Sequence, residues 1–163
     1  MTIHPIAPVF DISSRILILG SFPSVKSREE TFFYAHPANR FWRVIASVCG
    51  EGVPKTISEK KALLIRRGIA LWDVIGSCEI VGSSDSSIKN VLPNDISIIT
   101  GKCDIKKIFL NGKTAEKFFQ EFTADKLNIP FAVLPSTSPA NASYSYNKLL
   151  EVWRKNISLY VQQ

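Results

Sequence analysis

The sequence predicts a three-layer α/β/α fold in which helices cover both faces of a central, mainly parallel, four-stranded sheet. Short apolar stretches typical of strands alternate along the chain with longer segments of helical periodicity, which favours a parallel sheet. The first stretch, Ile16-Leu17-Ile18-Leu19, is apolar throughout, as in strands covered on both faces. A length of 163 residues with 45% hydrophobic side chains suits one domain, which we place over residues 1–163.

The first half of the chain supplies two strands and two helices. Residues 16–19 form the first strand, and the aromatic-rich segment 20–38 after it predicts an ordered loop. Apolar residues at helical spacing predict a helix over residues 39–48. A capping-box sequence at Thr56 and a glycine at 68 bound a second helix. The elements that we expect after it are a strand at 69–75, a polar surface loop at 76–90, a short helix at 94–100, a strand at 105–110, a helix at 113–122, a strand at 131–134 and a helix at 143–160.

In open parallel sheets, ligands bind beyond the carboxyl ends of the strands. Four segments follow predicted strands, namely residues 20–27, 73–85, 111–113 and 135–142. Because the strands run in one direction, these segments meet at one edge of the sheet. We therefore look for the functional site among them.

Charge and composition exclude several classes of protein. The net charge is +6, and each half of the chain carries ten basic and seven acidic residues, so no basic tail or block exists. No GxGxxG, GxxxxGK[ST] or GxSxG motif occurs. The three cysteines, Cys49, Cys78 and Cys103, are too scattered for an all-cysteine metal site. We expect no cofactor, no metal and no iron–sulfur cluster.

The amino-terminal residues MTIHPIAPVF lack the basic and apolar regions of a signal peptide, and the apolar runs are too short to span a membrane. We expect a soluble, cytoplasmic protein with no membrane partner. Of the two histidines, His4 lies near a terminus that we expect to be mobile. His36 is left as the one histidine available to a Ser-His-Asp hydrolase, which we keep as a remote alternative.

The loop at 20–27 and the loop at 135–141 are rich in serine, glycine and proline. Hydroxyls and backbone N–H groups in such loops suit phosphate contacts, although ordinary turns have the same composition. Between them, Tyr34 precedes a proline turn and could stack on a flat ligand, while Asn39 could cap the next helix. Arg40 and Arg43 could lie together on that helix, either facing a ligand or pairing with acids.

The motifs GSFPSVKS at 20–27, YAHPANRFW at 34–42, ALWDVIGSC at 70–78, FLNGKTA at 109–115 and LPSTSP at 134–139 occur in this order. The chain resembles the uracil-DNA glycosylase superfamily, and within it most closely the hypoxanthine-DNA glycosylase branch, called family 6. The YAHPANRFW motif is also shared with the mismatch-specific uracil-DNA glycosylase branch. The resemblance covers nearly the whole chain.

Two positions depart from the uracil-specific branches of that superfamily. Where those relatives place an Asp or Asn that orients the attacking water, this chain has Phe22. Where many relatives place a His that stabilises the departing base, it has Leu134. The hypoxanthine branch resembles this pattern, and the resemblance implies that Asn39 is the catalytic residue.

The resemblance also implies roles for other residues. Asp73 would read the base, although it could instead cap a loop or pair with an arginine, and Asn111 could line the pocket or cap a strand. The base-binding candidates are Phe22, Tyr34, Asp73 and Asn111, and the DNA-binding candidates are Ser21, Ser24, Ser27, Arg40, Ser136, Thr137 and Ser138.

The implied activity is that of a monofunctional DNA glycosylase in base excision repair. It would flip out and hydrolyse a deaminated base, hypoxanthine from deoxyinosine and possibly uracil, from DNA. The expected partner is DNA containing such a base, and the protein would act as a monomer associated with the nucleoid. The alternatives are a mismatch-specific uracil/thymine-DNA glycosylase and a non-catalytic DNA-binding module of the same fold.

Overall fold

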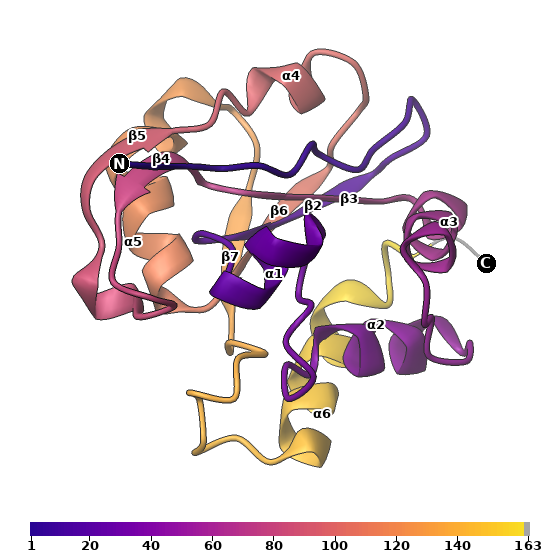
Figure 1. Ribbon diagram of the computed structural model, residues 1–163. Coiled ribbons are helices and arrows are strands. Elements are labelled where there is room, and N and C mark those ends of the chain that lie inside the picture. Colours follow the sequence, from indigo (N-terminus) through magenta and orange to yellow (C-terminus); the bar gives the residue numbers. More distant parts are fainter. Residues whose placement is uncertain (162–163) are drawn as a thin grey trace.

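A four-stranded parallel sheet forms the centre of the molecule in a computed structural model that describes residues 1–161 (Figure 1). Its strands are β2 (Ile16–Gly20), β3 (Ile69–Asp73), β6 (Lys107–Asn111) and β7 (Phe131–Leu134), arranged in the order β3-β2-β6-β7. Every neighbouring pair is parallel. The predicted α/β fold class is confirmed, and the four strands match the predicted segments within a few residues.

The central strand β2 is buried at all five positions, which explains its uniformly apolar sequence. Each isoleucine or leucine buried there contributes about 1.5–3 kcal/mol to folding through its removal from water. The edge strand β7 buries only Leu134 fully, and its Phe131 and Val133 remain more than a third exposed. The core therefore centres on β2 and its two neighbours.

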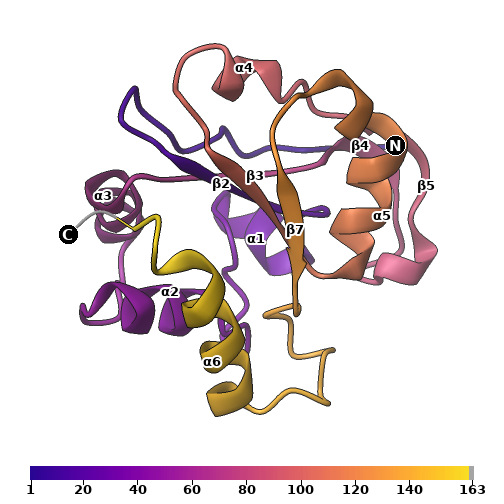
Figure 2. The same cartoon turned by 180° about the vertical axis from the view of Figure 1, so that it is seen from behind.

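Helices cover the sheet on both sides. The two views show α5 (Lys113–Phe122) on one side, and α2 (Phe41–Cys49) with α6 (Tyr146–Ile157) on the other (Figures 1 and 2). The α2 and α6 helices meet through Phe41 and Trp153, whose ring centroids are 6.0 Å apart. The remaining helices are α1 (Val25–Glu30), α3 (Ile57–Arg67) and α4 (Ser97–Thr100), with short 3₁₀ turns at Asp85–Ser87 and Ala124–Lys126.

The segment 20–38 is not entirely a loop, because it contains α1. Ser24 caps this helix by accepting a hydrogen bond from the backbone N–H of Ser27 at 3.2 Å. The helix has only six residues, too few for a clear apolar periodicity. It shapes the first loop after β2.

A second, antiparallel sheet was not predicted. Its strands are β1 (Thr2–Ile3), β4 (Ile75–Glu79) and β5 (Lys89–Pro93), in the order β1-β4-β5. The prediction of a surface loop over residues 76–90 is therefore wrong at its two ends, which belong to β4 and β5. These strands are short, and the pairing of β4 with β5 is irregular in register, so they lack the regular alternation that marks a strand. Pairing of β1 with β4 also fixes the amino-terminal residues, contrary to the mobile terminus we expected.

Helix ends follow the capping signals in the sequence. The Thr56 side chain accepts from the backbone N–H of Glu59 at 3.1 Å, and the Glu59 carboxylate accepts from the N–H of Thr56 in return. Gly68, at a φ of 75°, closes the same helix in the left-handed conformation that glycine adopts without strain. Within residues 1–161, no helix is long and apolar enough to cross a membrane.

Replacing Thr56 with alanine should lower the free energy of unfolding by about 1 kcal/mol, because the side-chain half of the capping box is lost. Urea denaturation of the wild-type protein and the variant measures this difference. Thr56→Ser keeps the hydroxyl and is expected to retain most of the stability. Equal losses in both variants would contradict the capping role.

Candidate active site

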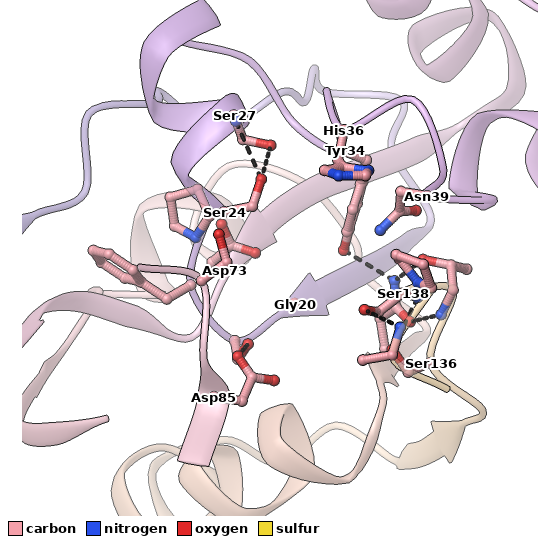
Figure 3. Close-up of a pocket in the computed structure, with 18 of the residues that line it drawn as sticks. Gly20, Ser24, Ser27, Tyr34, His36, Asn39, Asp73, Asp85, Ser136 and Ser138 are labelled. Carbon is pink, nitrogen blue, oxygen red and sulfur yellow. Dashed lines mark hydrogen bonds between the residues drawn. The ribbon is translucent and has the colours of Figure 1, made fainter. Parts of the chain in front are cut away.

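A cavity of about 580 Å³ opens at the carboxyl edge of the parallel sheet (Figure 3). The strand register places Gly20 beside Asp73, and Asn111 beside Leu134, at this edge. The cavity is lined by Gly20, Ser21, Phe22, Pro23, Ser24, Ser27, Phe33, Tyr34, His36, Asn39, Asp73, Ser83, Ser84, Asp85, Ser86, Asn111, Ser136, Thr137, Ser138, Pro139 and Ala140. All four segments that follow the strands contribute to it, as the sequence predicts.

Gly20 lies at the base of the cavity, where the absence of a side chain has a direct consequence. A Cβ atom at this position would lie 2.5 Å from Asp73 Oδ1 and 2.8 Å from the Tyr34 hydroxyl. Real Cβ atoms do not make such close contacts. Glycine therefore allows a carboxylate and a phenol to converge above the end of β2.

Tyr34 stands upright in the cavity on a left-handed backbone, with a φ of 54°. One face of its ring stacks on Phe41, with centroids 4.2 Å apart. Its hydroxyl accepts a hydrogen bond from Asn111 Nδ2 at 3.1 Å. Burial, reinforced by the negative charge of Asp73, raises the pKa of Tyr34 above its usual value, so the phenol stays neutral at physiological pH.

Asn111 connects the sheet to the last loop. Its Oδ1 accepts from the backbone N–H of Thr137, and its Nδ2 donates to Thr137 Oγ1, both at 3.0 Å. Asn111 therefore lines the cavity and braces the strand exit, so it combines the two alternatives left open by the sequence. Thr137 is fully buried by this pairing. The hydroxyl of Thr137 is thus enclosed in the protein, and its predicted contact with DNA stays a prediction.

Arg40 also acts within the protein. Its guanidinium donates to backbone carbonyls of the last loop, those of Thr137, Ser138, Asn141 and Tyr144. The arginine therefore ties the start of α2 to the loop at 137–144. The guanidinium donors of Arg40 point to these carbonyls, and its contact with a DNA phosphate stays a prediction.

The serines predicted to bind DNA separate into two groups. Ser27 is 2% exposed, and its Oγ accepts from the N–H of Ala35 at 3.1 Å, so it is engaged within the protein. Ser21, Ser24, Ser136 and Ser138 all line the cavity and remain partly accessible. Phosphate contacts by these four stay predictions.

Asn39 lies on the cavity, near Tyr34 and His36 (Figure 3). Its Oδ1 accepts from the backbone N–H of Phe41 at 2.9 Å, which fixes which end of the amide is oxygen. The structure thus shows the local bond at the start of α2 and also places the side chain on the cavity. His36 is exposed, and its Nδ1 accepts from the N–H of Ala38 at 3.1 Å, which gives a Ser-His-Asp triad no support.

Asp73 is 3% exposed at the end of β3 and is aimed into the cavity. Its Oδ2 lies 2.7 Å from Nε2 of His4, and neither an arginine nor a loop cap accounts for its burial. Phe22 packs edge-on against the His4 ring, with centroids 5.8 Å apart. No local pattern in the sequence indicates the role of His4, because it follows a strand of only two residues, β1, and its partner lies 69 residues away.

A second carboxylate, Asp85, faces the cavity from the 3₁₀ turn between β4 and β5. Ser21 Oγ donates to its Oδ1 at 3.4 Å. Partial desolvation raises the pKa of Asp85, and the charge of Asp73 adds to the rise, while hydrogen bonds from Thr114 and Ser21 oppose it. Among the described residues, no group of three or more histidine, cysteine or acidic side chains is arranged to hold a metal ion.

The fold and cavity define an α/β protein that binds its ligand at the carboxyl ends of parallel strands. The family model of the uracil DNA glycosylase superfamily matches residues 7–158. The chain therefore belongs to this superfamily, whose members hydrolyse N-glycosyl bonds in DNA. The resemblance inferred from the sequence motifs is confirmed.

Relatives within the superfamily are similar over most of their length. A hypoxanthine DNA glycosylase of Methanosarcina acetivorans is 34% identical over 142 residues, which cover 86% of this chain and 89% of that protein. A hypoxanthine DNA glycosylase of Methanosarcina barkeri is 32% identical, over 82% of this chain and 85% of its own. A solution NMR structure of a candidate uracil DNA glycosylase from M. acetivorans superposes with a TM-score of 0.81 at 31% identity, covering 94% of this chain and 95% of the other.

Replacing Arg40 with lysine should loosen the loop at 137–144, because an ammonium cannot reach the same set of carbonyls. Hydrogen bonds from charged donors contribute about 1.5–3 kcal/mol each, so backbone amides there should exchange with deuterium roughly tenfold faster or more. Hydrogen-exchange mass spectrometry resolves this segment. Arg15→Lys, on an exposed side chain elsewhere, is the matched control.

The opposite pattern would support the predicted contact between Arg40 and a DNA phosphate. In that case exchange at 137–144 stays unchanged, while the slope of log affinity against log salt falls by about one, as for the loss of one phosphate contact.

Proposed function

We propose that this chain is a monofunctional DNA glycosylase of base excision repair that removes hypoxanthine from deoxyinosine in DNA. The observation that carries the proposal is the buried Asp73 carboxylate aimed into the cavity. An ionised carboxylate accepts hydrogen bonds, and N1 of hypoxanthine carries a hydrogen, whereas N1 of adenine does not. The names of the two Methanosarcina relatives support the same substrate.

The cavity suits a flipped purine nucleotide. Its volume of about 580 Å³ lies within the usual range for small-molecule pockets. In this proposal the base lies between the rings of Phe22 and Tyr34, and Asp73 Oδ1 accepts from its N1–H. Extrusion of the nucleotide from the duplex costs a few kcal/mol and is easiest at a deaminated, mispaired base.

Contacts with the DNA backbone would come from the cavity rim. Ser21 and Ser24 follow β2, and Ser136 and Ser138 follow β7, so the hydroxyls flank the cavity on two sides. Hydroxyl and backbone N–H contacts position a phosphate backbone without reading its sequence. This leaves base discrimination to the cavity itself.

Asn39 would hold the attacking water. The bond from the N–H of Phe41 fixes the orientation of the amide, so the remaining lone pair of Oδ1 and the Nδ2 hydrogens keep constant directions. An amide is a poor base, and its contribution would be to position a water near C1′ while the sugar gains oxocarbenium character. No step requires an amine nucleophile, so the enzyme would lack abasic-site lyase activity.

A mismatch-specific uracil/thymine glycosylase is the second candidate. Uracil carries a hydrogen on N3 and presents a donor to Asp73 as hypoxanthine does. The shared HPANRFW motif at 36–42 also favours it. The absence of a water-orienting side chain at Phe22 speaks against it. A non-catalytic DNA-binding module is the third reading, and an excision assay separates all three.

The protein should excise hypoxanthine in preference to the other bases when it is incubated in excess with labelled duplexes. The duplexes carry hypoxanthine, uracil, xanthine or a G/T mismatch, and alkali cleaves the resulting abasic sites. Faster cleavage of uracil or of the mismatch would favour the second candidate, and no cleavage of any duplex would favour the binding module. A DNA–protein adduct trapped by borohydride would contradict the monofunctional mechanism.

Asn39→Ala should reduce single-turnover excision at least tenfold while DNA binding persists, as for the loss of a positioning group. Asn39→Asp is the informative companion, because its carboxylate can still accept from the N–H of Phe41 and still offers an oxygen to the water. It should retain more activity than the alanine variant. Near-normal excision by Asn39→Ala would show that the side chain only caps the helix.

A further inference from the structure

His4 lies beside Asp73 and Phe22, two residues that line the cavity, and it belongs to none of the segments that the proposed chemistry uses. Its side chain is 2% exposed, and that of its partner Asp73 is 5% exposed. We infer that His4 is a positioning residue that holds the Asp73 carboxylate as a hydrogen-bond acceptor and thereby restricts the cavity to bases that present an N–H donor. This inference rests on the proposed function and concerns how the same site distinguishes a deaminated base from its parent.

The hydrogen bonds of His4 determine where its proton lies. The backbone N–H of Ile6 donates to Nδ1 at 3.2 Å, so Nδ1 is an acceptor and carries no hydrogen. A neutral imidazole always carries one ring hydrogen, which must then be on Nε2. Nε2 lies 2.7 Å from Asp73 Oδ2. His4 therefore donates to Oδ2, and Oδ1 is the oxygen left for a ligand.

The surroundings keep the imidazole in this orientation. Its ring packs at 5.8 Å from Phe22, 6.2 Å from Phe33 and 6.3 Å from Trp72, measured between centroids. The backbone on either side is also fixed, because the N–H of His4 donates to the carbonyl of Gly76 at 2.8 Å. On the other side, Trp72 Nε1 donates to the carbonyl of Ile6 at 3.0 Å. These contacts hold the ring in place, and the N–H of Ile6 at Nδ1 keeps the ring hydrogen on Nε2.

If Asp73 Oδ1 is always an acceptor, it distinguishes bases that carry a hydrogen on N1 of a purine or N3 of a pyrimidine from bases that do not. Hypoxanthine and uracil present N–H groups there, whereas their parents adenine and cytosine present unprotonated nitrogens. A site that hydrogen-bonds its substrate rejects an analogue without the bonding group strongly, because buried polar groups are left unpaired. Guanine also carries an N–H at N1, so its exclusion depends on contacts other than Asp73.

The test compares His4→Phe and His4→Gln with the wild-type protein. Phenylalanine preserves an aromatic ring among Phe22, Phe33 and Trp72 but has no donor, whereas glutamine offers an amide donor for Oδ2. The substrates are duplexes that contain hypoxanthine or unsubstituted purine, whose N1 carries no hydrogen. Single-turnover excision rates are measured for both bases, and thermal unfolding confirms that each variant is folded.

We expect His4→Phe to lower the excision of hypoxanthine by at least roughly tenfold, as for the loss of a hydrogen bond to a charged group, and to leave the slow excision of purine unchanged. His4→Gln should restore part of the preference. A purely structural role would lower both rates together and leave their ratio unchanged, which would overturn the inference. If the wild-type protein excises neither base, the proposed function itself fails.

A measurement on the wild-type protein keeps the inference testable even if His4→Phe does not fold. The ¹⁵N chemical shifts of the His4 ring at neutral pH should show a protonated Nε2 and an unprotonated Nδ1. Protonation of Nδ1, alone or together with Nε2, would contradict the hydrogen-bond arrangement on which the inference depends.

Discussion

The parallel register of β2 between β3 and β6 is the constraint on which the site depends. It places Gly20 beside Asp73 and ends β6 at Asn111 along the same edge of the sheet. The ladder hydrogen bonds of the sheet fix these positions relative to one another independently of the loops. Since Gly20 has no side chain, Asp73 and Tyr34 can approach each other above it. The chemistry of the cavity is thus built on rigid strands, where precise geometry is easiest to hold.

The loops around this edge are held by polar groups that are all satisfied. Among the described residues, no buried side-chain nitrogen or oxygen lacks a hydrogen-bond partner. Asn111 fastens the last loop to β6, and Arg40 fastens its carbonyls to α2. Buried networks of this kind are costly when incomplete, so their completeness indicates a single loop arrangement. A cavity that is already ordered before DNA arrives loses little entropy on binding.

The sequence predicted the parallel sheet well, because strands such as β2 have continuous apolar runs and helices such as α3 have clear capping signals. It failed where a residue's environment depends on distant partners. Serine, threonine and arginine suit phosphate contacts by chemistry, yet Ser27, Thr137 and Arg40 are used inside the protein. The partners of Thr137 and Arg40 come from segments up to 104 residues away, which no local pattern encodes. Ser27 has a partner eight residues away, but its burial depends on how the segment after β2 packs.

The cavity is acidic although the protein has a net charge of +6. Asp73 and Asp85 both line it, and among the described residues no lysine or arginine does. Two cations in the segment after β2 are engaged within the protein. Lys26 pairs with Glu30 at 3.2 Å, and Arg28 donates to the carbonyl of Gly82. DNA phosphates are therefore not attracted most strongly to the cavity. A contact between a cation and a phosphate would in any case favour every base equally, because it carries no sequence information. In the proposed function, a carboxylate in the cavity repels backbone phosphates but accepts a hydrogen bond from the N–H of an inserted base. Base discrimination and DNA affinity would then come from different parts of the surface.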